Sequence, residues 1–316
     1  MWGGQIMRKH TLLTLLAFGS ITLSGCYVDL GFIQFGSKGV TDENHKDGRV
    51  IYDAEKDSQT ISTYYADIDG SKSGEALLSD LRNLNLSNRV STVGYKDMPY
   101  LFCYTDYDPA YTKWNSDGVP YSGHILSFYS GKQVIMGECD REHVWPASRL
   151  PGGRDNNVVD KDIYMPRPTC DEENQDRGNS CYITDMNSTS KGWDPVEAFG
   201  HTIGVHESIR GECARIIFYC MTADENCVLN DDPVYVEGGV TNMGKISDLM
   251  EWACENPVNL REKRRQVGGQ YLQGNRNAFV DHPEYACKIW GNATSRTKAA
   301  CQSANYEVGG SPLSSN

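Results

Sequence analysis

This chain of 316 residues contains eleven cysteines, enough for a fold held together by several disulfides. Such a fold requires export, because disulfides persist mainly outside the reducing cytosol. The N-terminus indicates such a destination: an apolar run over residues 12–23 follows Arg8, Lys9 and His10. A membrane-spanning helix needs roughly 20 residues, so this shorter run is typical of a secretory signal peptide. The sequence therefore predicts an exported protein whose fold can use disulfides.

The end of the apolar run predicts how the exported chain begins. It reads Leu-Ser-Gly-Cys, which resembles a bacterial lipobox with Cys26 as the lipidated first residue of the mature chain. A lipid on Cys26 would hold the protein at a membrane, whereas an ordinary cleaved signal would release it as a secreted protein. Both alternatives place it outside the cytoplasm.

Ten cysteines remain when Cys26 is set aside, an even number that suits disulfide pairing. Cys213 and Cys220 lie in a helical pattern, hence roughly 10 Å apart, whereas a disulfide needs Cα atoms within about 7 Å. These two residues need other partners or stay reduced. The sequence contains no Cys-x₂-Cys pair, which argues against a structural zinc protein.

Polarity divides the chain into a signal peptide (1–25), a polar tether (26–58), one folded domain (59–292) and a polar tail (293–316). The domain length suits a single hydrophobic core. Aromatic and β-branched residues broken by glycines predict strands and turns over 101–108 and 123–137. We expect a monomeric α+β domain.

Two stretches are predicted to be helices because apolar residues recur at i, i+3, i+4 and i+7. The stripes are Cys213, Ile216, Ile217, Cys220, Met221 and Ile246, Leu249, Met250, Ala253, Cys254. Pro257 is expected to end the second helix, and Asn259 with Glu262 predicts a capping box at the start of another. Cysteines on these stripes are interpreted as core or disulfide residues.

Three polar clusters carry residues suited to catalysis. Glu142 and Asn174 offer hard oxygen donors for Mg²⁺ or Ca²⁺, and His143 has a side chain suited to general base catalysis. Arg154, after two glycines, presents a planar fork that fits a phosphate. A metal, a base and an arginine together indicate hydrolysis of a phosphodiester.

Each cluster taken alone is also typical of a solvated surface loop. Adjacent residues on a regular strand point to opposite faces, so Glu142 and His143 can share a site only where the strand ends or bends. Trp145 and Pro146 follow directly, and a proline interrupts strand pairing. We therefore expect the strand to end at this position.

The order of these segments resembles the endonuclease I group of secreted and periplasmic ββα-metal (His-Me finger) nucleases, over roughly residues 64–290. The segments that carry the resemblance are REHVWPAS (141–148), GGR (152–154), RPTCDEENQDRGN (167–179), RGECARIIFYCM (210–221), ENPVNLREKRR (255–265) and QGNRNAFVDHPEYACKIW (273–290). The chain departs from the family at 162–166, where it reads DIYMP and many members have Asp-x-His-Asn-Leu.

The resemblance implies a single α+β domain built around a ββα-metal motif with additional strands and helices. It also implies that His143 is the general base, that Glu142 and Asn174 hold one Mg²⁺ ion (Ca²⁺ and Mn²⁺ being alternatives), and that Arg154 stabilises the scissile phosphate. The expected activity is endonucleolytic cleavage of DNA, with RNA as an alternative, leaving 5′-phosphate and 3′-hydroxyl ends. A rival hypothesis is a catalytically weak surface lipoprotein that binds nucleic acid or another partner.

The charge of the chain opposes nonspecific nucleic-acid binding. The formal net charge is −12, and loss of Arg8 and Lys9 with the signal segment leaves −14. Binding then requires a local concentration of basic residues. We expect phosphate contacts from Arg141, Arg177, Arg264, Arg265 and Arg276, the alternative being a solvated basic helix face.

Overall fold

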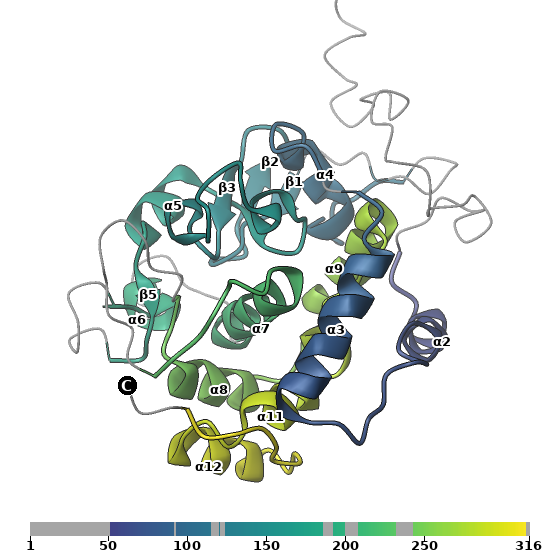
Figure 1. Cartoon of the computed structure of the whole chain (residues 1–316). Helices are drawn as coiled ribbons and strands as arrows, with labels where there is room; N and C mark the ends of the chain where they lie inside the picture. Colours follow the sequence, from purple (N-terminus) through teal and green to yellow (C-terminus); the bar gives the residue numbers. More distant parts are fainter. Residues whose placement is uncertain are drawn as a thin grey trace, which may run out of the picture.

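A computed structural model of the chain describes residues 51–91, 93–114, 120, 124–185, 192–199, 208–231 and 243–313. Cys26, the signal segment and most of the expected tether lie outside these residues. The described part is a mixed α+β domain in which helices predominate and strands are short (Figure 1).

Helix α7 (Ile209–Ala223) lies at the centre of the domain, and nearly all of its residues are buried (Figure 1). Helices α3 (Gly74–Asn88) and α8 (Ile246–Glu255) pack against it. The two predicted apolar stripes are confirmed as the cores of α7 and α8. Cys213 and Cys220 are buried and are not bonded to each other, as their spacing requires.

The predicted capping box is confirmed at the start of α9 (Leu260–Gln273). The Glu262 backbone N–H donates to Asn259 Oδ1 at 2.9 Å, and the Asn259 N–H donates to Glu262 Oε2 at 3.1 Å. Two backbone donors at the helix terminus are thereby satisfied. The local sequence alone determines where this helix begins.

The strand expected over 101–108 is wrong, because most of that segment belongs to helix α4 (Met98–Thr105). All but one of the α4 residues are buried, and Pro99 occupies the first turn. A short apolar run that is buried on every side shows no periodicity that distinguishes a strand from a helix. The strands expected over 123–137 are confirmed: β1 (His124–Leu126) and β2 (Gln133–Ile135) pair antiparallel.

Strands β3 (Asp140–His143) and β4 (Pro166–Thr169) pair antiparallel, and helix α5 (Asp171–Arg177) follows β4 and packs on β3 (Figure 1). The connection between the strands contains two short 3₁₀ helices, η1 (Ala147–Arg149) and η2 (Val158–Lys161). This is the expected ββα unit, and β3 ends at His143 as the Trp-Pro pair predicted.

The remaining elements surround this framework. They are α2 (Ala54–Tyr64), β5 (Cys181–Tyr182), β6 (Gly192–Trp193), α6 (Pro195–Phe199), α10 (Ala278–Asp281), α11 (Glu284–Trp290) and α12 (Ser295–Ser303). Strands β5 and β6 pair in parallel. None of the described helices combines the length and apolar character needed to cross a bilayer.

Both expected domain boundaries move outward. Helix α2 begins within the expected tether, and Asp57 on it accepts a hydrogen bond from Arg276 at 2.8 Å. Helix α12 lies in the expected polar tail and carries Cys301, which is bonded to Cys287. Both segments contain few apolar residues, so the sequence did not indicate that they belong to the domain. An ion pair and a disulfide hold them in place.

Candidate active site

Glu142 lies near the end of β3 and is almost entirely buried, with 2% of its surface exposed. The Tyr129 hydroxyl donates to its Oε1 at 2.7 Å, and Arg177 Nε lies 3.6 Å from the same oxygen. Burial raises the pKa of the Glu142 carboxyl, although Arg177 and the Tyr129 hydrogen bond act in the opposite direction. Arg177 and Tyr129, and not solvent, therefore stabilise the charged form of Glu142.

His143 occupies the last position of β3 and is also buried. Its Nδ1 lies 3.2 Å from the Arg141 carbonyl oxygen, and because a carbonyl can only accept, Nδ1 carries the proton of the neutral ring. The lone pair is then on Nε2, which lies 3.1 Å from Asp160 Oδ1 in a contact poorly aligned for a hydrogen bond. This tautomer leaves Nε2 as the basic atom.

Asp160 was not predicted from the sequence, because a single aspartate in a loop carries no distinguishing pattern. It lies in η2 and is buried beside His143. Burial acts to raise the pKa of its carboxyl, but His143, with Arg154 and Lys161, lowers the pKa below its ordinary value. The Asp160 carboxyl is thus held in its ionised form beside His143.

Tyr95 is a second residue that the sequence did not indicate. Its ring centroid lies 5.5 Å from that of His143, 4.2 Å from Arg141 Cζ and 5.7 Å from Arg154 Cζ. Guanidinium groups over an aromatic face gain cation–π stabilisation. One half-buried aromatic ring therefore gathers the imidazole and two of the predicted arginines, although Arg154 itself is exposed.

The predicted ligand Asn174 lies on α5 and reaches β3. Its Nδ2 donates to Asp140 Oδ2 at 3.0 Å. Asp140 and Glu142 lie two residues apart on one strand and so face the same side. Asp140, Glu142 and Asn174 together offer the hard oxygen donors that Mg²⁺ binds alongside waters, so the donor chemistry fits, with the Arg177 cation competing for Glu142.

Three arginines expected to contact nucleic acid are interior residues instead. Arg177 is fully buried against Glu142 and donates to the Val144 carbonyl at 3.0 Å. Arg265 pairs with Asp106 and donates to the Pro166 carbonyl at 2.9 Å. Arg276 lies between Asp57 and Asp281.

The expectation for these three is wrong, because buried and paired guanidinium groups have no exposed face for a phosphate. Of the other expected contacts, Arg141 and Arg264 are half-buried, so part of each side chain reaches the surface. The sequence pattern of the basic segment did not distinguish the two environments.

The departure from the family pattern at 162–166 has a structural explanation. Tyr164 is buried, and its hydroxyl donates to the Asn275 carbonyl at 2.8 Å. Its ring packs so tightly on α9 that a Cβ at Gly269 would lie 2.5 Å from the Tyr164 ring. Tyr164 therefore connects the approach to β4 with α9.

The burial of Glu142 predicts a stability effect. Because its folded pKa is raised, the folded state gains stability from the protonated acid at low pH and loses it as pH rises through the folded value. We expect Glu142→Gln, measured in EDTA, to match the wild type near pH 4 and to melt a few degrees higher at pH 8, where about 1 kcal/mol moves Tm by 2–4 °C. Exposed Glu138→Gln is the control, and an equal Tm difference at both pH values for Glu142→Gln would contradict the prediction.

Comparison with known proteins identifies the family of the chain. The model of the family described as Endonuclease I matches residues 73–284. The chain is 31% identical over 247 residues to a protein named extracellular ribonuclease from Bacillus amyloliquefaciens, covering 74% of this chain and 80% of that protein. It is 31% identical over 237 residues to an extracellular ribonuclease of Bacillus subtilis (strain 168), covering 72% and 78%. With the ββα unit in place, the chain belongs to the endonuclease I family, and is a nuclease with a nucleic-acid substrate.

Proposed function

We propose that this nuclease is an extracytoplasmic, divalent-metal-dependent endonuclease that cleaves DNA and RNA with little sequence specificity. The observation that carries the proposal is His143 at the end of β3, with Nδ1 held by a carbonyl and Glu142 next to it. The relatives named extracellular ribonucleases support both the export and RNA as a substrate beside DNA.

In the proposed mechanism, the imidazole of His143 takes a proton from the attacking water. Asp160 stabilises the imidazolium that results, because its carboxylate lies 3.1 Å away. Arg154, which is exposed and therefore free to reach substrate, holds the scissile phosphate. The bond to the 3′ oxygen breaks, which leaves a 3′-hydroxyl and a 5′-phosphate.

Glu142 and Asn174, with Asp140 beside them, would hold one Mg²⁺ ion. When bound, this ion supplies positive charge that stabilises the leaving oxygen. Arg177 lies 3.6 Å from Glu142 and fixes its carboxylate from the side of the protein interior. Ca²⁺ and Mn²⁺ offer the same charge and accept the same oxygen donors.

The test is cleavage of supercoiled plasmid and of single-stranded RNA by the purified chain lacking residues 1–25, with Mg²⁺ and with EDTA. We expect both substrates to be cut only with the metal, and the new 5′ ends to accept labelled phosphate only after phosphatase treatment. Cutting that EDTA does not reduce would exclude the metal. A folded protein that binds nucleic acid but cuts neither substrate with any divalent ion would support the non-catalytic lipoprotein instead.

We also propose that Cys26 carries a lipid that attaches a monomeric enzyme to a membrane. The lipobox-like sequence before Cys26 supports this attachment. The native protein should partition into a detergent phase, and Cys26→Ala should move it to the aqueous phase or the medium. Partitioning that is unchanged by the substitution would contradict the lipid.

Tyr95 offers a prediction for the arrangement of the site. Tyr95→Leu removes the ring that contacts His143, Arg141 and Arg154, and is expected to lower kcat/KM about tenfold, because mispositioned catalytic groups lose rate steeply. Tyr95→Phe keeps the ring and should retain most of the activity. Steady-state cleavage rates of the two variants measure the effect, and equal losses in both would assign the role to the hydroxyl.

A further inference from the structure

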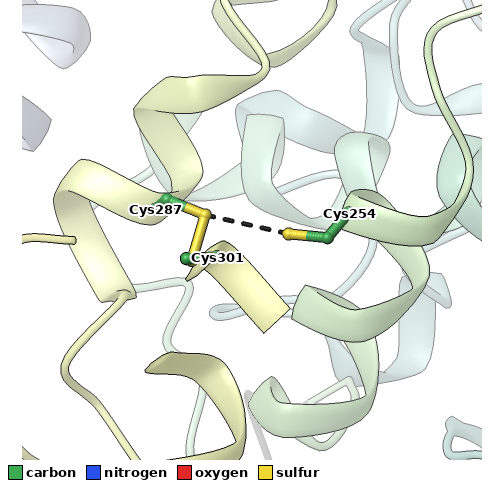
Figure 2. Close-up of side chains that lie close together, drawn as sticks. All are labelled: Cys254, Cys287 and Cys301. Carbon is green, nitrogen blue, oxygen red and sulfur yellow. Dashed lines mark hydrogen bonds between the residues drawn. A yellow bond between two sulfur atoms is a disulfide. The ribbon is translucent and has the colours of Figure 1, made fainter. Parts of the chain in front are cut away.

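Three sulfur atoms from three helices meet at the end of the domain opposite β3 and α5 (Figure 1, Figure 2). Cys254 lies on α8, Cys287 on α11 and Cys301 on α12, and the three sulfurs lie within 4.8 Å of one another. Cys287 and Cys301 form a disulfide, and Cys254 is a thiol whose Sγ is 3.8 Å from Cys287 Sγ. In the described part of the chain this is the one such cluster of cysteine, histidine or acidic ligand atoms.

We propose that these residues form a thiol–disulfide exchange site in which Cys287 pairs with either Cys301 or Cys254. The Cys254 thiolate attacks Cys287 Sγ, and the Cys254–Cys287 bond forms as the Cys287–Cys301 bond breaks. The electron pair of the broken bond leaves on Cys301, which takes up a proton from solvent in place of the one that Cys254 released. The number of disulfides is unchanged, so no oxidant or reductant is needed.

The surrounding structure allows both pairings. The sulfurs of Cys254 and Cys287 are already near van der Waals contact, although the compact triangle requires the disulfide to rotate before attack along the S–S axis. The present bond closes a separation of 14 residues and the alternative one of 33, and longer closed loops restrict the unfolded chain more. The alternative disulfide is therefore not disfavoured by chain entropy.

Ion pairs connect helix α12 to α8 independently of the disulfide. Arg296 on α12 lies 2.5 Å from Glu251 and 2.7 Å from Asp248, both on α8. Exchange thus moves the covalent link from α11–α12 to α8–α11 without requiring α12 to leave the domain. This feature is independent of the proposed nuclease chemistry, because it lies at the other end of the molecule (Figure 1).

Solvent reaches the attacking thiol through a pocket of about 380 Å³ between α8 and α12, with Cys254 in its wall. Burial raises the pKa of Cys254 to about 11, and the nearby carboxylate of Glu255 adds to this effect. The thiolate is therefore scarce at pH 5 and more abundant at pH 9. The groups that face the thiol are Glu251 and Glu255 from α8, Arg215 from α7, Cys287 from α11 and Tyr306 after α12.

The test is a disulfide map of the wild-type mature chain. Samples held for a day at pH 9 are quenched in acid, treated with N-ethylmaleimide in denaturant at acidic pH, digested with pepsin without reduction and analysed by mass spectrometry. We expect at least one molecule in ten to contain Cys254 linked to Cys287 with Cys301 alkylated. A map in which every molecule links Cys287 to Cys301 and carries an alkylated Cys254 would overturn the proposal.

Two controls make the result specific. Protein whose accessible Cys254 is blocked with N-ethylmaleimide before the incubation should contain only the Cys287–Cys301 link, which excludes rearrangement during the work-up. Cys301→Ser, produced in an oxidising compartment, should contain a Cys254–Cys287 disulfide. Recovery of this variant with both cysteines alkylated, or with Cys254 bonded to a different cysteine, would also overturn the exchange site.

Discussion

His143→Ala is expected to lower the rate of nucleic-acid cleavage by about 10²–10⁴-fold, the usual contribution of a general base. The substitution removes the imidazole, whose basic atom is Nε2 because Nδ1 donates its proton to the Arg141 carbonyl. Initial rates on plasmid and on RNA, at saturating Mg²⁺, measure the loss. Because the base acts on water, we expect the loss to fall on kcat more than on KM.

The control for this variant is His124→Ala, a substitution at an exposed histidine on β1 that should retain full activity. Added imidazole should restore part of the rate to His143→Ala by entering the vacated space, which a misfolded variant would not allow. Wild-type activity in His143→Ala would show that another group is the base or that a contaminating nuclease was measured.

Arg276→Ala is expected to destabilise the domain by about 3–5 kcal/mol, because removing one partner of a buried ion pair leaves the other charges uncompensated. The guanidinium donates to Asp57 at 2.8 Å and to both carboxylate oxygens of Asp281 at 2.7 Å. Without it, burial disfavours the Asp57 carboxylate with no arginine to oppose the effect. Urea unfolding followed by tryptophan fluorescence measures the change.

The matched substitution is Lys298→Ala, which removes an exposed positive charge from α12. It should change the free energy of unfolding by no more than about 0.5 kcal/mol. The two interpretations of Arg276 give opposite results. A fully stable Arg276→Ala protein with a weaker salt dependence of nucleic-acid binding would restore the surface interpretation.

The sequence predicted those parts of the fold that local patterns determine. Helices α7 and α8 follow from apolar stripes, and α9 follows from its cap, because all of this information lies within one element. The sequence of α4 predicts a strand instead, because the helix is buried by neighbours from distant segments and so shows no one-sided apolar pattern. The predicted phosphate contacts of Arg265 and Arg276 are wrong for the same reason. Their acidic partners are distant in sequence: Asp57 is 219 positions from Arg276, and Asp106 is 159 positions from Arg265.

The candidate site divides in the same way. Glu142, His143, Arg154 and Asn174 lie in segments whose order along the chain resembles a family, so they were predicted together. Tyr95 and Asp160 come from outside those segments, and only the folded chain brings them to His143. Residues that orient a site from a distance leave no spacing pattern in the sequence.

The two ends of the described domain are both fastened to its interior. Near the first, the Tyr65 hydroxyl donates to Asp281 at 2.9 Å and Asp57 holds Arg276. Near the second, Cys301 is bonded to Cys287 and the Leu313 N–H donates to the Ala293 carbonyl at 3.1 Å. Proteases begin at ends that fray, and here fraying of either end must break buried contacts. Exoproteolytic trimming that proceeds beyond Asp57 at one end or Cys301 at the other should therefore require opening of the domain itself.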